Sequence, residues 1–236
     1  MEMNGNTILI TGGATGIGYA MAKYFSERSN TVIICGRRED RLKQTARELP
    51  GIHTFKCDVS NHVDRKALFQ YVSNNFPDIN ILINNAGIQR DIDLTKGLDD
   101  LNSGDNEIQI NLEAPVYLSA LFTSILAGKE NATIINVSSG LAFMVERASR
   151  CPVYCATKAG LHAFSIAQRI QLAPVGIRVV EIIPPMVESE LNMEGRKKRN
   201  TLTSPFMVSS DEYVEKTMEK MEQNIDEIKW ERRELK

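Results

Sequence analysis

The stretch TGGATGIG, residues 11–18, decides the fold because it joins a buried strand to an amphipathic helix. The apolar run TILIT precedes it, and Ile17 to Arg28 carries apolar residues at intervals of three and four. Gly12, Gly16 and Gly18 lack a β-carbon, so a pyrophosphate can approach the backbone amides at the positive end of the helix. Glycines also occur in tight turns that bind nothing, but the strand before and the helix after favour a nucleotide site.

The rest of the chain alternates between short apolar runs and helix-length segments. The runs TVIIC, IHTFK, INILIN, ATIINV and IRVVEII are rich in β-branched residues and predict strands buried on both faces. Helices are predicted at 39–49, 61–76, 105–126, 154–173 and 209–224, and IDEIKW predicts a short seventh strand. We therefore expect one α/β domain over residues 1–236, a Rossmann-like doubly wound parallel sheet of six to seven strands with helices on both faces.

Composition excludes several classes of function. The 236 residues are 42% hydrophobic and 25% charged, which is typical of a globular domain with a large core. The formal net charge of -2 argues against a nucleic-acid partner. No apolar run approaches the roughly 20 residues of a membrane helix, and the N-terminus does not resemble a signal peptide. We expect a cytoplasmic protein with no membrane partner.

The cysteines and histidines predict no metal site. The four cysteines lie in or beside apolar stretches, which indicates reduced, buried thiols: Cys35, Cys57, Cys151 and Cys155. The three histidines are not spaced as in a zinc finger: His53, His62 and His162.

A tyrosine and a lysine four residues apart point to acid/base chemistry. In VYCATKAG, residues 153–160, helical spacing places Tyr154 and Lys158 on one face. An ammonium group held near a phenol favours the phenolate, so Tyr154 is a candidate general acid/base whose pKa we expect the Lys158 cation to lower. Taken alone, such a pair is more often a surface aromatic residue and a solvated lysine.

Four further motifs stand in a fixed order. They are NNAG at 84–87, INL with Asn111, NVSS ending at Ser139, and YCATK from Tyr154. Together with the GxxxGxG turn they resemble the short-chain dehydrogenase/reductase family over about residues 7–191. Within that family, VIICGRRE, CDVS, NNAGIQ, PVYCATKAG and PPMVESELN are similar to the bacterial DltE-like oxidoreductases.

The resemblance implies roles for four catalytic residues. Removing hydride from an alcohol requires loss of the hydroxyl proton, and Tyr154 would be the general acid/base for this step, with its pKa lowered by Lys158 together with nicotinamide charge. Ser139, the second serine of its pair, would hold and polarise the substrate oxygen, with Ser138 as the adjacent alternative. Lys158 would also hydrogen-bond the nicotinamide ribose beside Tyr154, and Asn111 would anchor a water that links Lys158 to solvent. Alone, serine pairs after strands are usually turns, and an asparagine is often a helix cap.

The end of the second strand predicts the cofactor. An NAD-preferring site typically offers an acid there, whereas CGRRED offers Arg37 and Arg38. Two guanidinium groups favour a 2′-phosphate, so we predict NADP(H) in preference to NAD(H). The alternative is that both arginines are solvated or pair with Glu39 and Asp40.

The resemblance also implies the remaining cofactor contacts. Asp58 and Val59 would contact the adenine, unless Asp58 merely caps the following helix. Pro185 stands where the family usually has glycine and restricts that turn. The full predicted set is Gly12, Thr15, Gly16, Ile17, Gly18, Arg37, Arg38, Asp58, Val59, Asn85, Ala86, Gly87, Tyr154, Lys158, Pro184, Val187 and Ser189.

These observations predict an NADP(H)-dependent oxidoreductase that interconverts an alcohol and a carbonyl on a small or medium organic substrate. The alternative is a catalytically idle NADP(H)-binding regulatory protein of the same fold. By resemblance, residues 186–207 form an irregular loop that covers the substrate, and the Asn111 and Tyr154 helices form a homodimer. A tetramer is left open because IDEIKW departs from the family's final strand. The identity of the substrate does not follow from the sequence.

Overall fold

Seven parallel strands form one sheet at the centre of the protein. The computed structural model describes residues 2–199, 201 and 207–230, without the side chains of Arg147 and Ala148. The strands are β1 (Thr7–Thr11), β2 (Thr31–Gly36), β3 (His53–Lys56), β4 (Ile81–Asn84), β5 (Thr133–Val137), β6 (Arg178–Ile183) and β7 (Glu227–Lys229). Their order in the sheet is β3-β2-β1-β4-β5-β6-β7, and every pairing is parallel. The predicted doubly wound parallel sheet is confirmed.

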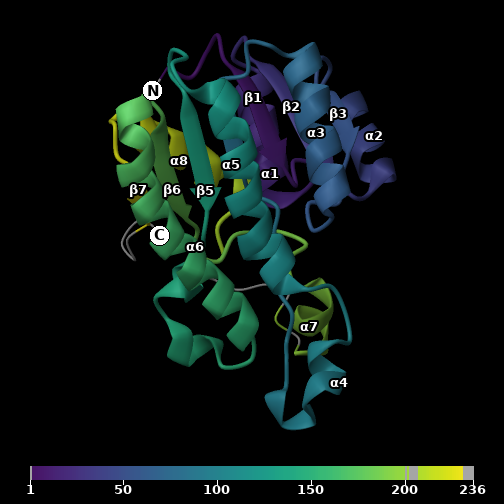
Figure 1. Cartoon of the computed structure of the whole chain (residues 1–236). Coiled ribbons are helices and arrows are strands. Elements are labelled where there is room, and N and C mark those ends of the chain that lie inside the picture. The colour runs from purple at the N-terminus through teal and green to yellow at the C-terminus, as the bar shows by residue number, and fades with distance from the viewer. Residues whose placement is uncertain (1, 200, 202–206, 231–236) are drawn as a thin grey trace.

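Helices cover both faces of this sheet (Figure 1). The α-helices are α1 (Gly16–Ser26), α2 (Glu39–Glu48), α3 (His62–Asn75), α4 (Leu98–Leu101), α5 (Ala114–Leu126), α6 (Pro152–Leu172), α7 (Met193–Lys198) and α8 (Ser210–Glu222). Short turns are η1 (Leu94–Lys96), the π-helical η2 (Gln109–Glu113), η3 (Gly140–Ala142), η4 (Val145–Ala148) and η5 (Ala173–Val175). In the described part of the chain, no helix combines the length and the apolar character needed to cross a bilayer.

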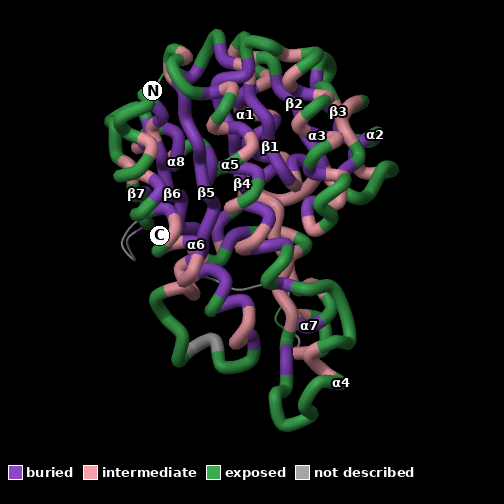
Figure 2. Tube along the Cα trace, in the orientation of Figure 1, coloured by how far each residue is buried: buried purple, intermediate pink, exposed green. Residues whose placement is uncertain are grey.

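The alternation of side chains along the strands builds two cores. Ile8 and Ile10 pack in the cluster with α1 and α8, whereas Leu9 packs in the cluster with α3 and α5. All three side chains are fully buried, and each such burial contributes about 1.5–3 kcal/mol. Figure 2 shows that buried residues follow the strands and the inner sides of the helices. This rigid sheet holds the loops at its carboxyl edge.

Three local features differ from the sequence predictions. The helix expected at 105–126 contains the π-helical turn η2, and the expected irregular segment 186–207 contains α7 and a bridge between Val187 and Val208. Residues 200 and 202–206 of that segment lie outside the described residues. The cap of α3 is Asn61, whose Oδ1 accepts from the Val63 and Asp64 amides, so the alternative role of Asp58 as that cap is wrong.

A row of polar side chains crosses the sheet from β4 to β7. By strand register its members are neighbours in the order Asn84, Asn136, Glu181 and Glu227. Asn84 Nδ2 donates to Asn136 Oδ1 at 2.9 Å and to Ser119 of α5 at 3.1 Å. Polar side chains buried between a sheet and its helices need such partners, so the row also fixes where the helices sit.

Asn136 is the central member of this row. Its Nδ2 donates to Ser165 Oγ at 3.0 Å and to Gln168 Oε1 at 2.9 Å, both on α6. Its side chain therefore joins β4, β5 and α6 through three buried hydrogen bonds.

Replacing Asn136 should destabilise the fold. We expect Asn136→Ala to lower the free energy of unfolding by about 2–4 kcal/mol, because it leaves buried partners on Asn84 and Gln168 unsatisfied. Urea denaturation of the variant measures the change. The exposed Asn74→Ala in α3 is the control and should change stability by less than about 0.5 kcal/mol. Equal effects of Asn136→Ala and Asn74→Ala would show that the hydrogen bonds of Asn136 do not contribute to the stability of the protein.

Candidate active site

The glycine turn is held in place by the end of β4. A β-carbon on Gly18 would lie 2.2 Å from the Gly12 carbonyl oxygen, and Gly12 itself has φ +65. Asn85 Nδ2 donates to the carbonyls of Thr11 and Gly12 at 2.9 and 3.2 Å. The Asn85 side chain therefore fixes the glycine turn to the end of β4. Because the glycines of the turn have no side chains, a bound group can approach the backbone of the turn closely.

Thr11 completes this contact and was not among the predicted site residues. Its hydroxyl oxygen accepts from the amides of Asn85 and Ala86, each at 3.0 Å, and donates to the Ile83 carbonyl at 3.3 Å. A threonine at a strand end carries no signal of this role in the sequence. The contact appears only because β1 and β4 are neighbours in the sheet.

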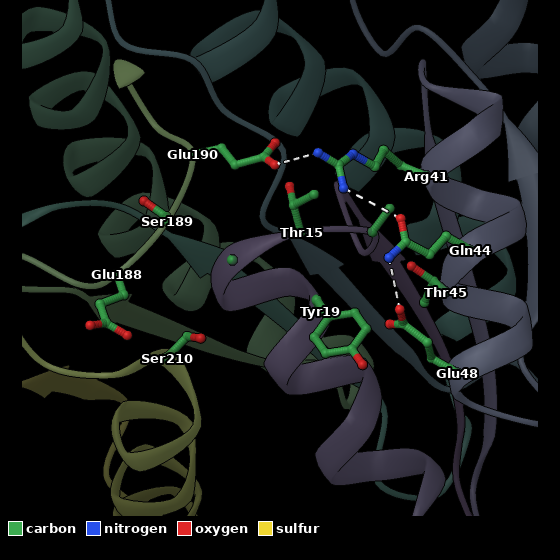
Figure 3. A pocket seen from close by; sticks show the side chains of 12 residues that line it. Thr15, Tyr19, Arg41, Gln44, Thr45, Glu48, Glu188, Ser189, Glu190 and Ser210 are labelled. Carbon is green, nitrogen blue, oxygen red and sulfur yellow. Dashed lines mark hydrogen bonds and ion pairs between the residues drawn. The ribbon is translucent and has the colours of Figure 1, made fainter. Parts of the chain in front are cut away.

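A pocket of about 280 Å³ opens beside the start of α1 (Figure 3). Its lining includes Thr15, Gly16 and Ser189 of the predicted cofactor set, and Ser189 lies against the turn: a β-carbon on Gly16 would be 3.0 Å from its Cβ. The lining residues that the sequence did not predict come mainly from α2 and the segment after β6: Arg41, Gln44, Thr45, Glu48, Glu188 and Glu190. The pocket is therefore continuous with the glycine turn.

Two arginines beside this pocket hold one carboxylate. Arg38 Nη1 and Arg41 Nη2 lie 2.6 and 2.9 Å from the two oxygens of Glu190. Arg38 also donates to Thr15 Oγ1 at 3.3 Å. Arg41 was missed by the sequence analysis, although it lies on the first turn of α2, one turn beyond Arg38. The two guanidinium groups thus bind an anion, the Glu190 carboxylate, as paired arginines commonly do.

Arg37 and Arg38 do not form the ion pairs with Glu39 and Asp40 that were the alternative to cofactor binding. Arg37 Nη1 lies 2.7 Å from Asp105, and Arg38 pairs with Glu190. Glu39 pairs instead with Lys43 and Lys56, because helical spacing and the neighbouring β3 bring those ammonium groups closer.

The predicted catalytic side chains converge at the carboxyl end of β5. Ser139 hydrogen-bonds the Tyr154 side chain, and Ser139 Oγ accepts from the Leu141 amide at 3.2 Å. Lys158 Nζ donates to the Val137 carbonyl at 2.8 Å and lies 5.7 Å from the centre of the Tyr154 ring. All three side chains are at least nine-tenths buried.

The neighbouring Ser138 is directed elsewhere. Its hydroxyl donates to the Ile182 carbonyl of β6 at 3.4 Å, and its amide donates to the same oxygen at 2.8 Å. Of the two serines, Ser139 is therefore the one that meets Tyr154.

The predicted lowering of the Tyr154 pKa is not found in the protein alone. Burial raises the pKa of Tyr154 well above its usual value, and this effect exceeds the opposing hydrogen bond from Ser139. Burial also lowers the pKa of Lys158 to about 8, although Glu181 acts in the opposite direction. Desolvation disfavours both charged forms, so the pair favours a neutral phenol and a readily deprotonated amine.

Asn111 lies in the π-helical turn η2 and contacts the loop after β4. Its Oδ1 accepts from the Ile88 amide and its Nδ2 donates to the Ile88 carbonyl, both at 2.8 Å, and Nδ2 also donates to Thr157 at 3.2 Å. A β-carbon on Gly87 would lie 3.3 Å from Asn111 Oδ1 and 3.5 Å from Lys158 Nζ. Asn111 Oδ1 and Lys158 Nζ therefore both lie beside Gly87, and π-helical turns frequently occur at functional sites.

Two buried thiols flank the tyrosine. Cys151 and Cys155 cluster with Tyr154, Leu141 and Leu191. Burial and the neighbouring Cys151 thiol raise the pKa of Cys155 to about 12. This thiol therefore stays protonated, and the pair forms an apolar wall beside the tyrosine hydroxyl.

The other predicted cofactor residues lie along the same edge. Pro184 accepts from the Gly140 amide at 2.9 Å, and Val187 is buried. Val59 and Ile17 pack into or against the cores. The Asp58 carboxylate accepts from the Ser60 amide and hydroxyl at 2.9 and 2.7 Å.

The burial of Lys158 should appear in the pH dependence of stability. Its folded pKa lies below the unfolded value, so the unfolded chain holds more protons between the two and stability rises with pH there. From about pH 7 to about pH 10, wild-type stability should rise by about 2 kcal/mol relative to Lys158→Met. Urea denaturation across this range measures the difference. Parallel profiles would show that Lys158 is not desolvated.

Comparison with known proteins agrees with this geometry. The family model described as short chain dehydrogenase matches residues 6–200. The uncharacterized oxidoreductase DltE of Bacillus subtilis (strain 168) is 45% identical over 232 residues, covering 98% of this chain and 90% of the relative.

Two solved structures are also similar. A short-chain dehydrogenase from Sphingobium yanoikuyae in complex with NADPH is 25% identical with a TM-score of 0.80, covering 94% of this chain and 86% of that one. A short chain dehydrogenase/reductase from Burkholderia phymatum in complex with NAD has a TM-score of 0.84 at 18% identity, covering 97% and 89%, and supports the fold alone. The matches and the fold together place this chain in the short-chain dehydrogenase/reductase family of NAD(P)-dependent oxidoreductases.

Proposed function

We propose that the protein uses NADP(H) to interconvert an alcohol and a carbonyl on a small or medium organic substrate. The observation that carries this proposal is the convergence of Ser139, Tyr154 and Lys158, all buried, at the same sheet edge as the glycine turn. A nicotinamide cofactor supplies or accepts the hydride, and the chain's own groups handle the proton and the substrate oxygen.

The roles follow from the contacts of each side chain. Tyr154 gives a proton to the substrate oxygen during carbonyl reduction and takes it back during alcohol oxidation. Ser139 hydrogen-bonds the tyrosine hydroxyl and orients the same oxygen. Lys158, whose pKa is lowered to about 8, can exchange a proton near neutral pH. Asn111 holds the Ile88 backbone and so the loop that carries Gly87.

The residues of the cofactor site fit a nicotinamide dinucleotide. The glycine turn would hold the pyrophosphate at the start of α1, and Lys158 would hold the nicotinamide ribose. We propose that the 2′-phosphate replaces the Glu190 carboxylate as the partner of Arg38 and Arg41. Both are anions, and paired guanidinium groups suit phosphate geometry.

We also propose the homodimer that the family resemblance implies. Tyr117 on α5 and Ile166 and Ile170 on α6 leave large apolar side chains exposed. Exposed apolar surface of this kind is often covered by another chain.

Removing the Tyr154 hydroxyl should separate binding from catalysis. We expect Tyr154→Phe to bind NADPH as the wild type does but to lose about 10²–10⁴-fold in turnover, because the proton donor is absent. NADPH fluorescence titration and carbonyl-dependent NADPH oxidation measure the two effects. Tyr24→Phe in α1 is the matched control and should change neither. Normal turnover by Tyr154→Phe would remove this residue from the mechanism.

The same assay separates the enzyme from a regulatory protein of the same fold. An enzyme oxidises NADPH when a suitable ketone, aldehyde or quinone is added. A regulator binds NADPH but gives no carbonyl-dependent oxidation across such a panel.

The arginine pair should set cofactor preference. We expect Arg38→Ala to weaken NADPH binding about tenfold and NADH binding less than about twofold, because only NADPH carries the 2′-phosphate. Glu190→Gln should strengthen NADPH binding about twofold to fivefold, because it removes a competing carboxylate. Fluorescence titration of both cofactors measures these changes.

Two further variants sharpen this test. Arg47→Ala, at the far end of α2, is the control and should leave both affinities unchanged. Arg37→Ala should have a smaller effect than Arg38→Ala, because Arg37 pairs with Asp105. Equal loss of NADPH and NADH affinity in Arg38→Ala would contradict recognition of the 2′-phosphate.

A further inference from the structure

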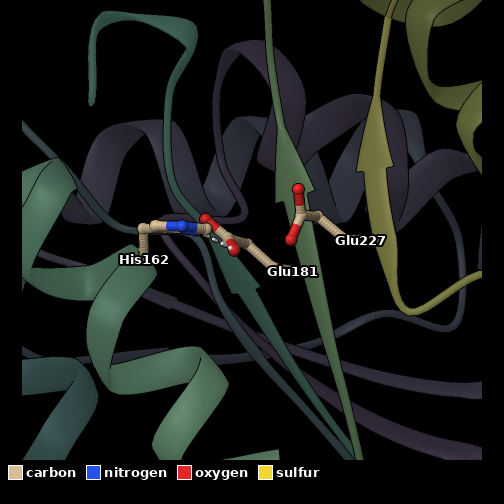
Figure 4. Close-up of side chains that lie close together, drawn as sticks. All are labelled: His162, Glu181 and Glu227. Atoms are coloured by element: carbon tan, nitrogen blue, oxygen red, sulfur yellow. Dashed lines mark hydrogen bonds and ion pairs between the residues drawn. The ribbon is translucent and has the colours of Figure 1, made fainter. Parts of the chain in front are cut away.

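Three side chains far apart in the sequence meet at the outer part of the sheet (Figure 4). His162 comes from α6, Glu181 from β6 and Glu227 from β7. One nitrogen or oxygen atom from each lies within 4.8 Å of the corresponding atoms of the other two. His162 Nδ1 and Glu181 Oε2 are 2.7 Å apart.

Glu181 has an unused oxygen in this cluster. The side chain is fully buried, and Oε2 is bonded to His162. Among the described residues, nothing hydrogen-bonds to Oε1. A buried carboxylate oxygen without a partner costs considerable free energy, so the arrangement calls for a positively charged ligand.

The surrounding charges strengthen this requirement. Glu181 and Glu227 are direct neighbours across β6 and β7, where like charges repel. A protonated His162 would balance only one of the two carboxylates.

Positive side chains on these strands are directed to other groups. Lys229 Nζ lies 4.4 Å from the centre of the Phe143 ring, and Arg178 Nε lies 2.7 Å from Asp226. Asn84 and Asn136, the other members of the polar row, have neutral hydrogen-bond partners. Lys158 on α6 interacts electrostatically with Glu181, but its Nζ donates to the Val137 carbonyl and burial favours its neutral form. The two glutamates are therefore the part of the row that a bound cation would stabilise.

We propose that His162, Glu181 and Glu227 bind a divalent transition-metal ion of the zinc class. One imidazole nitrogen and two carboxylate oxygens are ligands that Zn²⁺ accepts, and mixed nitrogen and oxygen donors favour it over Mg²⁺ or Ca²⁺. The exposed side of Glu227 gives the ion access to solvent. Bound there, the ion ties the three-residue strand β7 to β6 and α6. The inference does not depend on the proposed reaction.

No pattern in the sequence predicts this site. His162 and Glu181 are 19 residues apart, and neither spacing nor motif connects them to Glu227. The site depends on the register of β6 with β7 and on the position of α6 over them.

Zinc binding by the full-length chain tests this proposal. After chelator treatment, calorimetric titration with Zn²⁺ should show one ion bound per chain and a raised thermal midpoint. His162→Gln and Glu227→Gln should each weaken binding by about tenfold or more, because each removes one of three ligands. Glu181→Gln should do the same if it folds. The exposed Glu130→Gln is the matched control and should bind like the wild type.

Cobalt distinguishes this site from the thiols beside Tyr154. Co²⁺ at His162, Glu181 and Glu227 should give a visible spectrum without a thiolate charge-transfer band, and Cys151→Ser should leave it unchanged. A thiolate band, no binding, or unchanged affinity in both His162→Gln and Glu227→Gln would overturn the proposal. In that case His162 and Glu181 form only a hydrogen-bonded pair.

Discussion

The contact between the ends of β1 and β4 is the constraint on which the site depends. The Thr11 hydroxyl accepts two amides of the β4 loop, and the Asn85 side chain returns two hydrogen bonds to the glycine turn. Four hydrogen bonds therefore hold the turn and the loop together. Because Gly87 follows in the same loop and lies beside Asn111 and Lys158, this contact connects the glycine turn to the proposed catalytic residues.

Burial determines the pKa values of Tyr154 and Lys158 more than the interaction between the two groups does. Tyr154 and Lys158 share a helix face, but desolvation raises the pKa of the phenol and lowers that of the amine. The two groups are therefore driven toward their neutral forms, while the hydrogen bond from Ser139 acts in the opposite direction and favours the phenolate. A dinucleotide carrying positive charge on its oxidised ring would shift this balance toward the phenolate, because it adds charge in a site that excludes water.

The sequence predicted what depends on local patterns. The β-branched runs predicted β1, β2, β4, β5 and β6, which are largely buried on both faces, and motif order predicted the residues around Tyr154. The burial predicted for IHTFK is wrong: β3 lies at the edge of the sheet and none of its residues is fully buried. The roles of Thr11, Arg41 and Glu190 depend on contacts between distant elements, so no local pattern signals them. The lowering of the Tyr154 pKa by Lys158 and nicotinamide charge stays a prediction for the cofactor complex. In the protein alone this pKa is raised, because it depends on how much water the fold removes, which spacing does not report.

The segment after β6 is attached to the rest of the protein differently from the sheet residues. Glu190 pairs with Arg38 and Arg41, and Asp91 bonds Asn192 and Arg199. These contacts are partly solvent-exposed, and exposed ion pairs are each worth about 0–1 kcal/mol. The buried hydrogen bonds and apolar side chains of the sheet are individually worth as much or more and are far more numerous. A cofactor phosphate could therefore exchange partners with Glu190 at small cost, while the sheet keeps Ser139, Tyr154 and Lys158 in place.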